Sequence, residues 1–276
     1  MEKAPGFDRQ KFTRDKRRLQ IGKRGVEYVV MNPPEVLEQR HTVLLIPGFL
    51  CRLSNMALLG HELTRYGYQA IPIAHELPDE SASEDIRMMI EEYYAGRFGD
   101  PSGPLTLVEH SLAAINGVEC LVDHPALIPM VHGVVQIAPA GYGGVSPFSA
   151  PCSVATELAH RPSSHDVRDA VVDALTYTYN CGRNMLQLAN RASKTDISSW
   201  AQELASEGLM TTALIAEHDR LIAYKSLLKG LNRAGVPSTL LSVPHAGHNA
   251  HLLFPAKTAG DVVLQIRSSH EYPDAA

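Results

Sequence analysis

The hydrophobic pattern of the chain changes abruptly at Ser111. The apolar run over residues 105–108 is typical of a buried strand, whereas residues 113–122 carry apolar side chains three to four positions apart, as in a helix. The pattern therefore predicts a strand that turns directly into a helix at Ser111. A serine on such a tight turn is lifted clear of the sheet. The amide of Leu112, at the helix N-terminus, is then free to bind an anion.

This turn has the geometry of a nucleophile elbow, although its flanking residues are unusual. The common elbow sequence is Gly-x-Ser-x-Gly, because the backbone packs closely against the turn two residues before and after the serine. Here those positions hold Glu109 and Ala113. Ala113 is a mild change, but Glu109 brings a long ionisable side chain and is expected to perturb the elbow. A serine after a strand can also be a simple helix cap.

Three consequences of Glu109 remain open at this point. In a packed interior without a partner, the carboxyl would have a raised pKa and stay neutral. Close to a catalytic histidine, its charge would stabilise the imidazolium and weaken the histidine as a base. If it distorts the elbow, Ser111 would no longer align with a base.

Strand and helix patterns alternate along most of the chain. The residues at 18–22 and 27–31 predict an opening hairpin, and the later β-α-β alternation predicts a mostly parallel sheet covered by helices on both faces. The predicted later strands are 41–49, 68–73, 105–108, 131–138, 212–216 and 238–243, and the predicted helices are 54–66, 81–98, 113–122, 224–234 and 255–267.

The alternation is interrupted between residues 142 and 208. This range contains helical patterns but no convincing strand. We therefore expect residues 1–141 and 209–276 to form one α/β core, and residues 142–208 to form an inserted helical lid over the C-terminal edge of the sheet. A chain of 276 residues that is 45% hydrophobic can bury a core of this size.

Polar residues follow the last two predicted strands. Asp219 comes after the strand at 212–216, and His248 comes after the strand at 238–243. All strands of a parallel sheet end at the same edge, so Ser111, Asp219 and His248 can meet there.

Each of these two positions has rivals. Glu217 is a second acid near Asp219, and His245 and His251 compete with His248. Gly247 favours His248, because glycine permits unusual backbone angles and a close approach. His110, beside the serine, is expected to serve in packing or at the surface.

The order serine, acid, histidine on this strand pattern resembles the α/β-hydrolase fold. The resemblance runs from residue 41 to 266 and rests on residues 46–49, the elbow, the strand at 131–138, Asp219 and His248. It implies an eight-stranded type of sheet and a serine esterase or lipase-like activity.

The resemblance also implies roles for individual residues. Ser111 would be the nucleophile, His248 its general base and Asp219 the group that orients the imidazole. The amides of Phe49 and Leu112 would form the oxyanion hole. No metal or organic cofactor is implied.

The expected substrate is a small, largely apolar carboxylic ester. Leu50, Tyr142, Phe148 and Trp200 are candidates for an apolar acyl pocket, although aromatic residues at helical spacing are more often ordinary core. The alternative function is a protein with a perturbed elbow that binds a small apolar ligand.

Composition narrows the class of partner and the compartment. A formal charge of −5 gives no general attraction to nucleic acid or acidic membranes. The amino terminus is charged and no apolar run reaches membrane-spanning length, so we expect a soluble, cytoplasmic protein. The four cysteines lie far apart, which indicates neither a zinc site nor a disulfide framework. Oligomeric state is not indicated.

Overall fold

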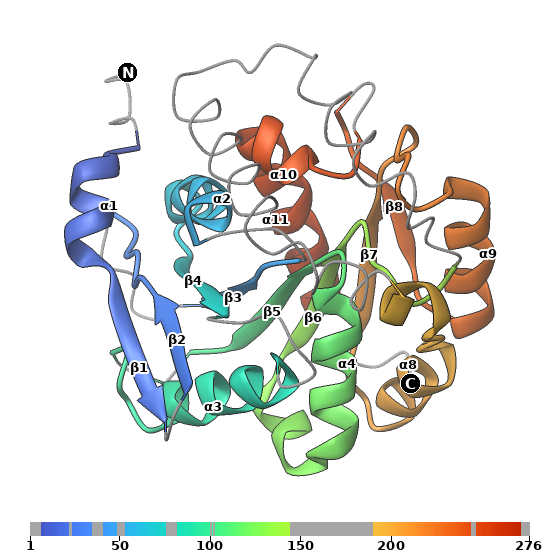
Figure 1. Ribbon diagram of the computed structural model, residues 1–276, viewed down its shortest axis with the longest axis horizontal. Helices are drawn as coiled ribbons and strands as arrows, with labels where there is room; N and C mark the ends of the chain where they lie inside the picture. Colours follow the sequence, from blue (N-terminus) through green and yellow to red (C-terminus); the bar gives the residue numbers. More distant parts are fainter. Residues whose placement is uncertain are drawn as a thin grey trace.

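The structure is a computed structural model, in which one sheet carries helices on both faces (Figure 1). It describes residues 7–21, 24–34, 41–48, 53–75, 82–99, 101, 103–143, 190–243 and 247–271.

Eight strands of the described chain form one sheet in the order β1-β2-β4-β3-β5-β6-β7-β8. The pairs β1–β2 and β2–β4 are antiparallel, and all other neighbouring pairs are parallel. The predicted, mostly parallel sheet is therefore confirmed. The strands are β1 Arg17–Ile21, β2 Arg24–Tyr28, β3 Thr42–Ile46, β4 Gln69–His75, β5 Leu105–His110, β6 Gly133–Ile137, β7 Thr211–Ile215 and β8 Ser238–Leu240.

The helices form two layers on the sheet. Helices α3, α4, α8 and α9 cover one face, and α2 and α11 cover the other, with α10 at the start of α11 (Figure 1). The helices are α1 Arg9–Asp15, α2 Leu53–Arg65, α3 Ala82–Tyr94, α4 Ala113–Asp123, α8 Ser198–Ser206, α9 Tyr224–Ala234, α10 Ala250–Leu253 and α11 Pro255–Glu271, with a 3₁₀ helix at Pro125–Met130.

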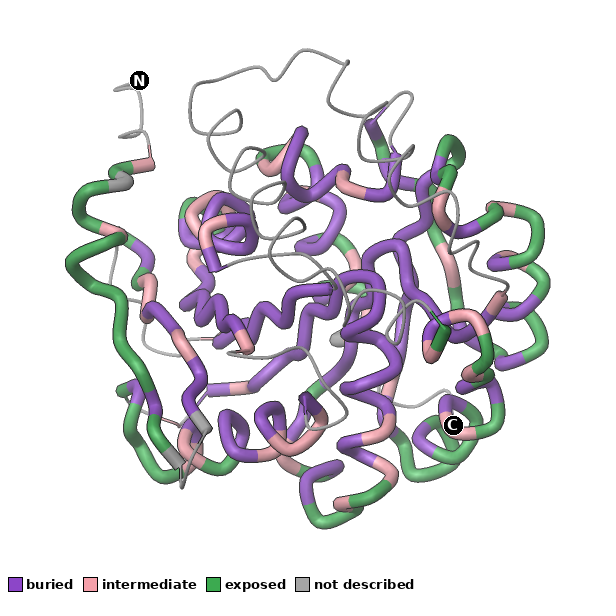
Figure 2. The backbone as a smooth tube through the Cα atoms, viewed as in Figure 1, coloured by how far each residue is buried: buried purple, intermediate pink, exposed green. Residues whose placement is uncertain are grey.

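The central strands β3, β5 and β6 are buried along their whole length (Figure 2). Successive side chains point to opposite faces, so Leu107 packs under α3 and α4 while Val108 packs under α2 and α11. The same alternation sends Glu109 toward α4 and His110 toward α10. Burial on both faces explains the continuous apolar runs in the sequence.

Some predicted boundaries differ from the structure. Helix α3 ends at Tyr94 rather than at residue 98, because Gly96 and Gly99 adopt positive φ angles of 78° and 126°. The strand predicted at 131–138 is β6, which begins only at Gly133 because a 3₁₀ helix precedes it.

Helix α1 was not predicted. Its signal is a cap: the side chain of Asp8 accepts a hydrogen bond of 2.9 Å from the amide of Lys11. The ring of Phe12 packs beside the cluster formed by Val29, Leu53 and Ala74.

Most of the predicted lid, residues 144–189, lies outside the described residues. The C-terminal part of the predicted lid, residues 190–208, is described and contains α8, which packs into the core beside α4 and α9 through Ala201 and Leu204. Among the helices described, none combines the length and hydrophobicity that crossing a bilayer requires.

Candidate active site

Ser111 lies on a strained turn between β5 and α4. Its φ angle is 55°, a region that non-glycine residues rarely occupy and that costs roughly 1–3 kcal/mol. The neighbouring strand holds the turn in place: the amide of Ser111 donates to the carbonyl of Ile137 at 3.0 Å, and the amide of Ala140 donates to the carbonyl of Ser111 at 3.0 Å. The strand-to-helix turn predicted from the sequence is therefore present, and it places Ser111 at the C-terminal end of β5, where its hydroxyl faces His248.

Ser111, His248 and Asp219 form a continuous chain of hydrogen bonds. Nε2 of His248 lies 2.8 Å from the Oγ of Ser111, and Nδ1 lies 2.8 Å from the Oδ2 of Asp219. All three residues are buried. Because a carboxylate only accepts, Nδ1 carries the proton, which leaves Nε2 as an acceptor facing the serine hydroxyl. This is the tautomer that a general base needs.

The carboxylate of Asp219 is fixed by its own backbone neighbours. Its Oδ1 accepts hydrogen bonds from the amides of Leu221 at 2.8 Å and Ile222 at 2.9 Å. The second oxygen is therefore left for the imidazole of His248. The rival acid, Glu217, is exposed to solvent.

The rival histidines are not equivalent to His248. The ring of His251 lies in α10, with its centroid 4.0 Å from that of His110, and is fully buried. Burial, with a contribution from His248, lowers the pKa of His251 to about 3. His251 is therefore neutral at ordinary pH. His245 lies outside the described residues.

The two proposed oxyanion donors are unequally placed. Leu112 directly precedes α4, where the first amides have no helical acceptor. Phe49 and Leu50 lie outside the described residues, but Gly48 packs against the elbow. A Cβ atom at Gly48 would lie 2.6 Å from the carbonyl oxygen of His110 and 2.8 Å from the Cβ of Ser111. The loop after β3 therefore reaches the nucleophile only because residue 48 is a glycine.

Glu109 is accommodated beneath the elbow rather than beside the imidazole. Its side chain is completely buried on the α4 side of the sheet, where its Oε2 accepts a 3.0 Å hydrogen bond from the Nε2 of Gln136 on β6. Gly117 supplies the space, because a Cβ there would lie only 1.6 Å from the Oε1 of Glu109. Burial raises the pKa of Glu109 to about 8, although the Gln136 hydrogen bond lowers it somewhat. The carboxyl is therefore mostly neutral at pH 7.

Gln136 and Gly117 were not singled out from the sequence. A glycine inside a helix is unfavourable by about 0.5–1 kcal/mol relative to alanine, so Gly117 signals that something approaches α4 closely. Glu109, eight residues earlier, is the group that does so. Gln136 has no comparable signal, because its role depends on the parallel register that pairs it with Glu109.

The raised pKa of Glu109 predicts a pH-dependent stability. Between its ordinary value of 4.5 and about 8, the folded protein retains a proton that the unfolded chain releases. The free energy of unfolding should therefore fall as pH rises through this range, by roughly 3–5 kcal/mol in all. Glu109→Gln cannot ionise and should remove this component. Urea unfolding of both proteins at pH 5 and pH 8 checks this; equal pH dependence in the two would contradict the assignment.

Two of the three aromatic residues predicted to line an acyl pocket lie in the described part of the chain. Tyr142 and Trp200 pack into the core cluster under α4, α8 and α9, and Phe148 lies outside the described residues. Burial first, and the nearby Glu109 second, raise the pKa of Tyr142. Tyr142 and Trp200 thus make core contacts, and their place in an acyl pocket stays a prediction.

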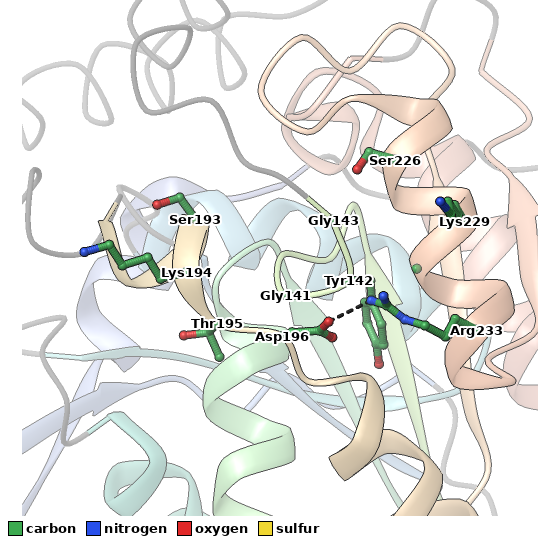
Figure 3. A pocket seen from close by; sticks show the side chains of 11 residues that line it. Gly141, Tyr142, Gly143, Ser193, Lys194, Thr195, Asp196, Ser226, Lys229 and Arg233 are labelled. Atoms are coloured by element: carbon green, nitrogen blue, oxygen red, sulfur yellow. Dashed lines mark hydrogen bonds and ion pairs between the residues drawn. The ribbon is translucent and has the colours of Figure 1, made fainter.

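A cavity of about 330 Å³ lies between the loop after β6, the segment before α8 and helix α9 (Figure 3). Tyr142 is part of its wall, and Arg233 reaches across to Asp196 at 2.7 Å. Its walls are largely polar, and Ser111, Asp219 and His248 are not among its lining residues. In the part of the chain that is described, no three His, Cys, Asp or Glu side chains are grouped so that they could hold a metal ion.

The sequence matches no family model and no curated protein, but many solved structures share its fold. An esterase from Exiguobacterium antarcticum is 11% identical with a TM-score of 0.62, covering 88% of this chain and 96% of that one. A serine hydrolase involved in carbazole degradation is 17% identical with a TM-score of 0.62, covering 92% and 98%. An α/β hydrolase enzyme from a sediment metagenome of the Mar Chica lagoon, Morocco, is 12% identical with a TM-score of 0.57, covering 92% and 99%.

These likenesses extend over nearly the whole of each chain. The protein has the α/β-hydrolase fold.

Proposed function

We propose that the protein is a serine hydrolase that cleaves a small, largely apolar carboxylic ester through an acyl-enzyme. The observation that carries the proposal is the hydrogen-bond chain from Asp219 through His248 to Ser111, with 2.8 Å at each step. The positive φ angle of Ser111 adds support, because backbone strain is concentrated at functional sites.

The reaction follows from the protonation states of Ser111, His248 and Asp219 in this series of hydrogen bonds. The Oγ of Ser111 attacks the ester carbonyl as its proton passes to Nε2 of His248, and Asp219 stabilises the resulting imidazolium. The amide of Leu112, together with that of Phe49, would stabilise the negative oxygen of the tetrahedral intermediate. When the intermediate collapses, His248 returns the proton to the leaving alcohol. Water then attacks the acyl-enzyme by the same route, releasing the acid and restoring Ser111.

The structural neighbours are consistent with this chemistry. Those that share the fold include an esterase and a serine hydrolase. At 11–17% identity their substrates do not transfer to this chain. The apolar acyl group is proposed from the surroundings of the elbow, where Leu112 and Ile115 are buried apolar residues.

The alternative, a binding protein with a perturbed elbow, has less support. It required Glu109 to push Ser111 out of line, whereas Gly117 accommodates the carboxyl and Ser111 remains within hydrogen-bond distance of His248. A neutral Glu109 carboxyl on the α4 side of the sheet would also not stabilise the imidazolium form of His248.

A panel of p-nitrophenyl esters with acyl chains of two to twelve carbons tests the proposal. We expect measurable turnover with the highest kcat/KM at short or medium chain length. Ser206→Ala, which removes an exposed hydroxyl in α8, is the matched control and should retain the wild-type rate. Hydrolysis no faster than with the Ser111→Ala protein, across the whole panel, would contradict the proposed function.

A further inference from the structure

His110 contacts three separate parts of the candidate site. It is the last residue of β5 and directly precedes Ser111. Its Nε2 lies 3.0 Å from the backbone carbonyl oxygen of His248, and its ring centroid lies 4.0 Å from that of His251, with the two rings tilted by 45°. On its other side, a Cβ at Gly48 would lie 2.7 Å from its Nδ1. One buried ring thus touches the histidine loop, helix α10 and the loop after β3.

Strand β5, which carries His110, is held on both sides, whereas the segment that carries His248 is not part of the sheet. Strand β5 lies in the middle of the sheet and is paired on both sides, by β3 and β6. His248, by contrast, is followed by α10, which has only four residues. The carbonyl of His248 is buried and accepts a hydrogen bond from a side chain of the rigid strand. The sheet thereby fixes the backbone that carries the imidazole facing Ser111.

We propose that His110 is a positioning residue for the reaction proposed above: as the neutral tautomer with its proton on Nε2, it holds the backbone of His248 in register with the nucleophile elbow. The tautomer follows from the contact, because a carbonyl oxygen only accepts a hydrogen bond. This inference rests on the proposed function, since it concerns the alignment of the catalytic base.

The electrostatic surroundings of His110 favour its neutral form. The titratable groups that face it are His248 from the histidine loop and His251 from α10. Burial, followed by these two histidines, lowers the pKa of His110 well below its ordinary value. His110 thus adds no positive charge beside His248, which must itself take a proton during the reaction.

Two substitutions separate positioning from packing. His110→Phe keeps a ring against His251 but removes the donor to the carbonyl of His248. His110→Gln loses the ring, but its amide nitrogen reaches a similar position and can donate. Since a misplacement of about 1 Å costs on the order of 10²-fold, we expect His110→Phe to lower kcat roughly 10- to 100-fold with KM changed less than about twofold. His110→Gln should retain kcat within about fivefold.

His41→Phe is the matched control. His41 directly precedes β3, whereas Gly48, which contacts His110, follows β3. The ring of His41 contacts Tyr68 and His132. The His41→Phe substitution should leave kcat within about twofold of the wild-type value. Wild-type kcat in His110→Phe, or equal losses in His110→Phe and His110→Gln, would overturn the proposal.

A second measurement does not depend on activity. Long-range ¹H–¹⁵N NMR of the wild-type protein reports which ring nitrogen of each histidine carries a proton. At neutral pH, we expect His110 to be protonated on Nε2 only. Protonation on Nδ1 would overturn the proposal even if His110→Phe does not fold. Absence of any esterase activity in the wild type would instead contradict the proposed function. The NMR result would then still test the hydrogen bond from His110 to the carbonyl of His248.

Discussion

His248→Ala is expected to lower kcat/KM for the best ester substrate by roughly 10³- to 10⁶-fold, because the imidazole is the only base within hydrogen-bond distance of Ser111 in the described chain. Ser111→Ala should cause a loss of similar size. The double variant should be little worse than either single one, because the two side chains act as a unit. Steady-state kinetics with the three purified proteins provides the measurement.

Asp219→Asn completes this series with a loss on the order of 10⁴-fold, because the amide no longer selects the tautomer that accepts from Ser111. Glu217→Gln is the control, since this exposed acid lies two residues away and should leave the rate unchanged. Full activity in Asp219→Asn together with a large loss in Glu217→Gln would show that the acid has been misassigned.

Gly117→Ala is expected to destabilise the fold by about 3 kcal/mol or more. Helix propensity alone would predict a gain of about 0.5–1 kcal/mol for this change. The sign is reversed because the new methyl group would lie 1.6 Å from the Oε1 of Glu109. This carboxyl is completely buried, so relieving the overlap must displace the Glu109 side chain or α4 within a closely packed interior. Urea unfolding gives the change in stability, and ester hydrolysis should fall with it because α4 begins two residues after Ser111.

A double-mutant cycle identifies the cause of this loss. Glu109→Gly restores the usual small residue before the nucleophile and removes the group that Gly117 accommodates. The pair Glu109→Gly with Gly117→Ala should therefore be more stable than the sum of the single changes predicts, by about 1–3 kcal/mol. Gly260→Ala in α11 is the matched control, because its Cβ would meet only the end of the Tyr66 side chain, at 3.3 Å. Additive single effects would show that Glu109 and Gly117 do not share space.

Much of this fold could be predicted because its centre is strongly patterned. Strands β3 and β5 are buried on both faces and are apolar over most of their length, and the spacing of three to four after Ser111 is that of α4. The meeting of Ser111, Asp219 and His248 needed only the rule that parallel strands end at one edge. Local patterns together with this general rule were sufficient for these features.

The rest depends on contacts between distant residues. His110 and His248 are 138 positions apart along the chain, and their hydrogen bond joins a side chain to a backbone carbonyl, which leaves no trace in residue type. The environment of Glu109 depends on the register of β5 with β6 and on the single glycine of α4 that faces it. Helix α1 was missed because it has only seven residues, most of them polar, so its apolar side chains are too few to show a helical spacing.

The central claim is that Ser111 is an activated nucleophile, and a fluorophosphonate probe tests it most directly. The wild-type protein should gain one probe per chain, which peptide mass spectrometry should locate on Ser111, and the His248→Ala protein should label far more slowly. An unmodified Ser111 after prolonged exposure of the folded wild-type protein would contradict the claim.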